Sequence, residues 1–99
     1  MLFKWFDATE SKKFGHALAL FFVERMPSAK QYGDKAFEMK ANKVANQMAE
    51  KVLRFKQQHK LNTYKKAQLG NAFKWALVDA GFAPDYADKL TNWLVMQLG

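Results

Sequence analysis

The chain has 99 residues, of which 49% are hydrophobic and 15% aromatic, and this apolar content excludes a chain that is disordered throughout. No apolar stretch approaches the roughly 18 residues of a membrane span, so a transmembrane protein is not expected. The chain has no cysteine, which excludes disulfides, thiol nucleophiles and thiolate metal sites. A chain of this length is expected to form one domain around one core.

The formal net charge of +7 is concentrated in one segment. Residues 35–66 hold nine lysines and arginines against two acidic residues, whereas residues 1–34 and 67–99 together sum to zero. Such an asymmetry indicates an anionic partner more specifically than the total charge does. The competing interpretation is a solvated helix face that only keeps the protein soluble.

The spacing of apolar residues predicts an all-α protein, because strand-type alternation is absent throughout the chain. We expect a single-domain four-helix bundle with a long second helix and a C-terminal helical hairpin. The four helices are predicted at about 7–25, 34–59, 63–80 and 84–98.

The first helix is expected to begin at Asp7, which forms a variant of the capping box with Glu10. It should end near Arg25, because a proline follows two residues later. Apolar side chains surround it almost completely, since Leu20 and Val23 lie roughly opposite its main apolar face. A helix of this kind is either central or covered on its second side, and residues 1–6 are a candidate for that cover.

The first thirty residues also share features with a secretory signal, because two lysines precede ten largely apolar residues. Acidic residues Asp7 and Glu10 interrupt what should be a positive leader, and Glu24 follows the apolar run directly. We therefore interpret this segment as part of the fold and expect a cytoplasmic protein.

The long second helix has an apolar stripe and a basic edge. Its apolar residues from Phe37 to Phe55 recur every three or four positions and fall within about 80° of one another, which predicts a core stripe. A row of cations follows one flank of that stripe, and further lysines follow the helix. The resulting candidate anion-binding or nucleic-acid-binding patch comprises Lys40, Lys43, Lys51, Arg54, Lys60, Lys65 and Lys66.

The last two helices carry clear boundary signals. Asn62 or Thr63 is expected to cap the third helix, and Gly81 should end it in a Schellman motif with Phe82 packed back on the helix. Pro84 suits the first position of the fourth helix, where its missing amide would have no partner. The link between these helices is so short that they must be neighbours.

Apolar side chains beyond the predicted core indicate a surface for a protein partner or for a second copy of the chain. A four-helix domain of this size has difficulty hiding both faces of two helices. Aromatic residues and methionine are enriched in such interfaces. The candidate partner surface comprises Trp5, Leu20, Val23, Tyr64, Trp75 and Val78.

Catalytic and metal-binding motifs are lacking. His16 and His59 fall in different predicted helices, with no carboxylate at a motif spacing, and no glycine-rich phosphate loop occurs. The sequence therefore predicts no enzyme, no cofactor and no metal site. A DNA-reading helix-turn-helix is also disfavoured, because Asp85 and Asp88 would bring carboxylates to the phosphates.

We therefore predict a small non-enzymatic protein-interaction module, whose partner is either another protein or a second copy of the chain. The alternative is weak, sequence-nonspecific binding of single-stranded nucleic acid through residues 35–66, with Tyr64 and Trp75 stacking on bases if they lie nearby. Fourteen lysines against two arginines argue against a dedicated phosphate reader. A membrane-surface role is weaker still, because the most apolar helix is not the most basic one.

Overall fold

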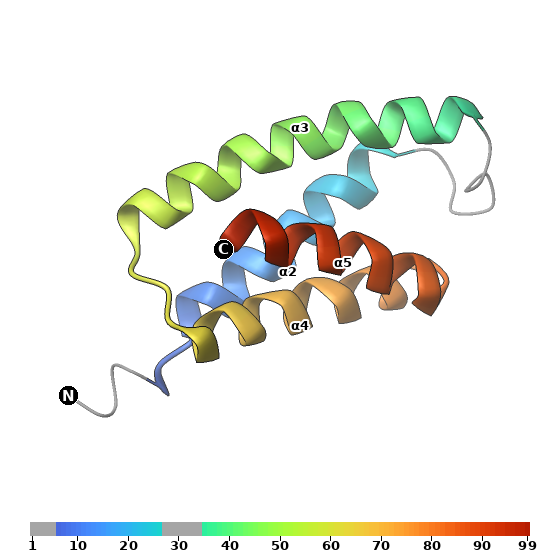
Figure 1. Cartoon of the computed structure of the whole chain (residues 1–99). Coiled ribbons are helices and arrows are strands. Elements are labelled where there is room, and N and C mark those ends of the chain that lie inside the picture. Colours follow the sequence, from blue (N-terminus) through green and yellow to red (C-terminus); the bar gives the residue numbers. More distant parts are fainter. Residues whose placement is uncertain (1–5, 27–34) are drawn as a thin grey trace.

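The computed structural model of the chain describes residues 6–26 and 35–99 (Figure 1). Within these ranges the structure has no strand, and its long helices confirm the predicted all-α fold with a long second helix and a C-terminal hairpin. The helices are α2 (Thr9–Arg25), α3 (Lys35–Gln58), α4 (Thr63–Asp79) and α5 (Pro84–Leu98). Trp5, which was expected to cover the first helix, lies outside the described residues.

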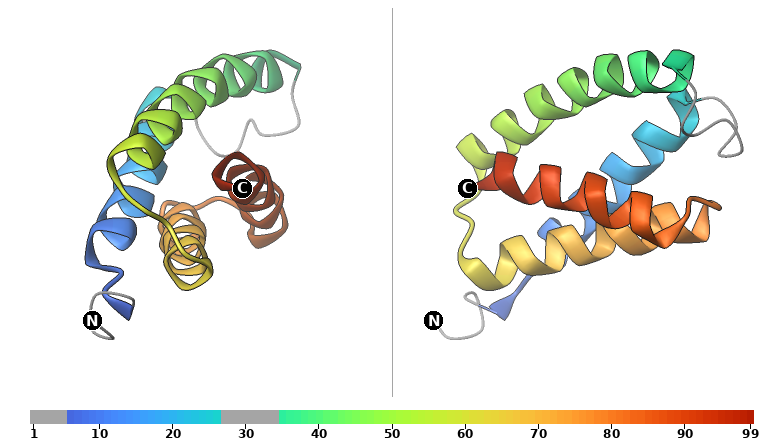
Figure 2. Two further views of the ribbon diagram at one scale, coloured as in Figure 1. Left: turned by 60° about the vertical axis from the view of Figure 1, so that its left-hand side comes forward. Right: turned by 45° about the vertical axis from the view of Figure 1, so that its right-hand side comes forward.

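The helices form an elongated bundle that measures 47 × 23 × 19 Å. Helices α4 and α5 pair as a hairpin, and α2 packs along α4 (Figure 1). The long helix α3 lies over this group and contacts both α2 and α5 (Figure 2). As a result, α3 has two flanks, one facing α2 and one facing α5.

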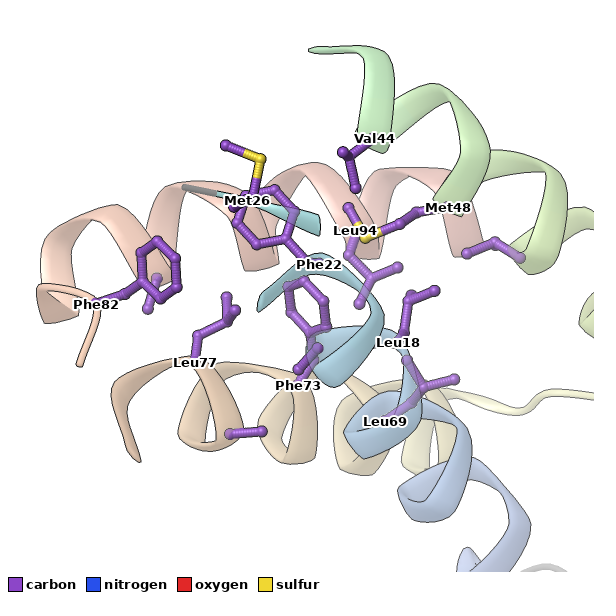
Figure 3. Packing of buried hydrophobic residues seen from close by; sticks show 14 of the residues in the cluster. Leu18, Phe22, Met26, Val44, Met48, Leu69, Phe73, Leu77, Phe82 and Leu94 are labelled. Carbon is purple, nitrogen blue, oxygen red and sulfur yellow. The ribbon is translucent and has the colours of Figure 1, made fainter. Parts of the chain in front are cut away.

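The core lies where all four helices meet. Phe22 of α2 and Phe73 of α4 point into it, together with Leu94 of α5 and Met48 of α3 (Figure 3). The predicted stripe of α3 is confirmed, because one face of the helix is buried and Ala41 on that face is half-buried. The buried side chains are Phe37, Val44, Met48, Val52 and Phe55. This one-sided burial leaves the basic edge of α3 beside the core, at the surface.

The start of α2 differs from the prediction. The helix begins at Thr9, and Ala8 occupies the cap position without a side-chain hydrogen bond. Asp7 lies one residue too early to cap it, and its Oδ1 instead accepts a hydrogen bond from the Thr9 amide at 3.1 Å. Aspartate often bonds to the backbone two residues ahead in this way. The predicted N-cap position of Asp7 is therefore wrong, although its side chain does accept from an amide of the first turn.

The boundaries of the C-terminal hairpin agree with the prediction. The Asn62 side chain caps α4 by accepting from the Lys65 amide at 2.8 Å. At the other end, the Gly81 amide donates to the Val78 carbonyl at 3.0 Å and the Phe82 amide to the Leu77 carbonyl at 3.1 Å. These two bonds form the Schellman motif. Gly81 has a φ of 104°, which favours glycine.

Replacing Gly81 with alanine is expected to lower the free energy of unfolding by about 1 kcal/mol, because a side chain strains this left-handed backbone. No atom lies within 4 Å of the added Cβ, so the loss is conformational and not steric. Urea titration followed by circular dichroism measures it. Gly81→Asn is the matched control, since asparagine tolerates this conformation better and should lose less. Equal stability of the alanine variant and the parent would contradict the left-handed backbone conformation at Gly81.

Candidate functional site

The residues of the predicted basic patch are spread over three elements. Lys40, Lys43, Lys51 and Arg54 are exposed along one edge of α3, as their spacing predicted. Lys60 is exposed after α3, and Lys65 and Lys66 are half-buried in the first turn of α4. The environments of these cations decide which of them act together.

Lys56, on the same helix, has a structural contact. Its Nζ donates to the Gln97 carbonyl at 3.1 Å, near the end of α5. A cation at the C-terminus of a helix is favoured by the negative end of the helix dipole. Lys56 therefore ties the end of α3 to α5.

Lys60 and Lys65 share a hollow of about 450 Å³ with two acidic residues, Asp7 and Glu10. Hydrogen bonds from Thr9 lower the pKa of Asp7, and the nearby charge of Lys65 lowers it further. Because cations and carboxylates are equal in number here, this end of the predicted patch has little net charge to offer an anionic ligand.

A second hollow, of about 250 Å³, lies between α2 and α3 and is rich in cations. Its centre is Phe21, whose ring centroid lies 3.6 Å from the guanidinium carbon of Arg25 and 4.6 Å from Nζ of Lys51. Arg54 also lines the hollow, and Glu50 is its acidic residue. We call this the cationic hollow, defined by Phe21, Arg25, Gln47, Glu50, Lys51 and Arg54.

An apolar hollow of about 370 Å³ adjoins it along the same two helices. Phe14 of α2 and Phe55 of α3 stack in its wall, with ring centroids 4.1 Å apart and an interplanar angle of 13°. The Phe55 ring also stacks on the ring of His59, with their centroids 4.3 Å apart. The apolar hollow is lined by Phe14, Ala17, Leu18, Phe21, Lys51, Arg54, Phe55 and Gln58.

The two hollows are neighbours along α2 and α3, because Phe21, Lys51 and Arg54 line both, and together they make up one surface region. We call it the α2/α3 groove. The spacing along each helix explains it: Phe14 and Phe21 are seven residues apart and share a face of α2. The basic edge of α3 follows a spacing of three and four residues, which places Lys51 and Arg54 together on the side that meets α2.

The opposite flank of α3 has its own groove, of about 350 Å³, against α5. Tyr86, Leu90 and Trp93 are half-buried along it. Its rim carries one acidic residue, Glu38, and one basic residue, Lys89. The two flanks of α3 therefore differ in charge, and the positive charge faces α2.

The predicted partner surface is only partly exposed. Leu20 and Trp75 are 41% and 52% exposed. Val23 and Val78 are instead half-buried, because both side chains pack against the hydrophobic core. Tyr64 is also half-buried, with its ring edge-on to Phe6 at a centroid distance of 5.5 Å.

Sequence reasoning missed Phe21 and Arg25 as site residues. In the sequence, Phe21 is one of the apolar residues of the first helix, and Arg25 marks the end of that helix. The available signal was their spacing of four residues, at which an aromatic ring and a cation meet on one helix face. Their position beside Lys51 depends on the pairing of α2 with α3, which no local pattern encodes.

In residues 6–26 and 35–99, no group of three or more histidine, cysteine, aspartate or glutamate side chains is placed to hold a metal ion. None of the helices in the same ranges has the length and apolar content needed to cross a membrane.

Comparison of the chain with models of protein families, with curated proteins and with solved structures finds no match.

Proposed function

We propose that the protein is a non-enzymatic interaction module that binds a segment of another protein in the α2/α3 groove. The observation that carries this proposal is the sharing of Phe21, Lys51 and Arg54 between an apolar hollow and a cationic hollow. A single ligand can therefore bury apolar surface and pair its charges at once. Aromatic residues and arginine are also the residues most enriched where binding energy concentrates in interfaces.

Two cations of this groove, Arg25 and Lys51, already contact Phe21 before a ligand arrives. Arg25 lies over the Phe21 ring, and its Nη1 donates to the Phe21 carbonyl at 3.3 Å. Lys51 approaches the same ring. Ordering a long side chain on binding costs about 0.5–1.5 kcal/mol, so side chains that are already positioned lose less. This arrangement supports a binding role better than a row of freely moving lysines does.

Single-stranded nucleic acid is the alternative ligand, supported by the exposed Lys40 and Lys43 on the same edge of α3. Base stacking, however, requires free aromatic faces next to the cations. Phe14 is stacked on Phe55, and two cations cover Phe21. The stacking candidates Tyr64 and Trp75 belong to α4, whereas the cationic hollow is formed by α2 and α3. A protein segment is therefore the better ligand.

Selection from a library of random displayed peptides tests the proposal. We expect the protein to enrich peptides that bind the groove, and Lys51→Glu with Arg54→Glu to weaken their binding more than tenfold, since it reverses two charges that line both hollows. Both side chains are exposed, so the variant should fold normally.

The matched control is Lys40→Glu with Lys43→Glu, which makes the same charge change on the same edge of α3 but outside the groove residues. It should alter peptide binding less than threefold. Trp75→Ala tests the exposed apolar surface of α4 and should also leave binding unchanged. Failure to enrich any peptide, or an equal loss in both charge-reversed variants, would exclude the groove as the binding site. Retention of oligo(dT) at low salt that both variants abolish would instead support the nucleic-acid alternative.

A further inference from the structure

We propose that the segment bound in the α2/α3 groove is an acidic amphipathic helix. This inference rests on the proposed function and adds the chemistry and conformation of the partner.

The charge of the groove selects carboxylates. Arg25, Lys51 and Arg54 face one acidic residue, Glu50, in the cationic hollow. The guanidinium of Arg25 stacks on Phe21, with one hydrogen bond to the Phe21 carbonyl. A stacked guanidinium presents its planar set of N–H donors at the edge, which is the geometry that pairs with a carboxylate. Glutamate or aspartate side chains are therefore the groups that complement this hollow.

The other two hollows described above lack this selectivity. The groove between α3 and α5 has one charge of each sign, from Glu38 and Lys89. The hollow around Lys60 and Lys65 contains the carboxylates of Asp7 and Glu10. Charge complementarity with carboxylates therefore distinguishes the α2/α3 groove from these two hollows.

The apolar wall and the shape of the groove favour a helix. Phe14 and Phe21 are half-buried, so each residue keeps some exposed apolar surface beside the rings and cations that already contact its faces. They lie seven residues apart on α2, and residues recurring at four and seven positions on a bound helix contact such a wall. A groove between two helices accepts a third helix by the same side-chain packing that joins helices in a bundle.

The length of the groove sets the size of the ligand. Its residues on α3 extend from Gln47 to Gln58, eleven residues along the helix. At 1.5 Å per residue this is roughly 16 Å, which corresponds to about three turns of a bound helix. The cationic hollow includes Gln47 and the apolar hollow includes Gln58, so the acidic residues should lie toward one end of the ligand and its apolar residues toward the other.

Fluorescence anisotropy with designed peptides tests this inference. The probe is an 18-residue, fluorescein-labelled helical peptide with leucines at positions i, i+4 and i+7 and glutamates in the turn beyond them. Two comparison peptides carry glutamine in place of the glutamates, or the same composition in scrambled order. We expect the acidic helix to bind, and the glutamine and scrambled peptides to bind at least tenfold more weakly at low salt.

Charge reversal on the protein supplies the matched test. Lys51→Glu with Arg54→Glu should weaken the acidic peptide more than tenfold and should bind a lysine version of the same helix better than the parent protein does. Lys40→Glu with Lys43→Glu should change neither peptide more than threefold. Circular dichroism of each variant confirms that the fold is retained.

The outcomes separate this inference from the proposed function. Library-selected peptides that bind the groove without acidic residues or helical pattern would overturn the acidic helix while leaving the interaction module intact. Equal binding of the glutamine and glutamate peptides would also overturn it. If neither selected nor designed peptides bind, the proposed function fails as well. A different result would assign the basic edge to nucleic acid. In that case oligo(dT) displaces the labelled peptide more strongly than unlabelled acidic peptide does, and both charge-reversed variants lose oligo(dT) binding equally.

Discussion

Alanine in place of Gly15 is expected to lower the free energy of unfolding by about 2–4 kcal/mol, because it forces apart two tightly packed helices. A Cβ at Gly15 overlaps the carbonyl oxygen of Leu69 and lies 3.1 Å from its carbonyl carbon. These are backbone atoms of α4, and Leu69 is fully buried, so neither can move aside cheaply. In an exposed helix interior the same substitution stabilises by about 1 kcal/mol, so the sign of the change is diagnostic.

Gly70→Ala is the matched control for Gly15→Ala, and chemical denaturation of both measures the difference. A Cβ at Gly70 lies 3.2 Å from the Val95 Cγ2 methyl, a side-chain atom of a residue that is itself exposed. This methyl can shift, and the gain in helix propensity offsets the strain, so a change within about 1 kcal/mol is expected. A Gly15→Ala variant as stable as the parent would show that α2 and α4 do not meet at Gly15.

Truncation of Phe22 to alanine is expected to cost about 3–5 kcal/mol, the range for deleting a buried aromatic ring. Phe22 is completely buried at the centre of the core (Figure 3). Its ring centroid lies 5.7 Å from that of Phe82 and 6.5 Å from that of Tyr86. Phe22 therefore joins α2 to the turn between α4 and α5 and to the first turn of α5. A midpoint of thermal unfolding lowered by more than about 10 °C corresponds to this loss in a domain of this size.

Leu53→Ala provides the control for Phe22→Ala, because this large apolar side chain of α3 is 54% exposed. Its removal should change stability by less than about 0.5 kcal/mol. Similar losses in the two variants would contradict the placement of Phe22 in the core and Leu53 on the outer face of α3.

Features encoded locally were predictable from the sequence. The stripe from Phe37 to Phe55 follows from the 3.6-residue period of a helix, and its burial confirms it. The Schellman end at Gly81 and the cap at Asn62 depend on residues within one turn of each other. The predicted N-cap at Asp7 was wrong, because the helix begins at Thr9 with Ala8 at the cap position, and the Asp7 side chain accepts from the Thr9 amide instead.

The candidate site was predictable only in part. The exposed edge carrying Lys51 and Arg54 was found from spacing alone. Phe21 and Arg25 were not, because their role depends on which helix packs beside α2. The burial of Val23 likewise depends on the close approach of neighbouring helices, which its position on the helix does not reveal.

The sequence by itself determined that the protein is all-α, where its helices lie to within a few residues, and that its positive charge falls on one edge of the second helix. Helix period, capping and charge order act over a few residues, so they can be read without a structure. The tertiary structure decided that α2 closes on α4 at Gly15 and pairs with α3, which brings Phe21 and Arg25 to the basic edge. These contacts join residues far apart in the chain, and they are selected by the packing of the whole core.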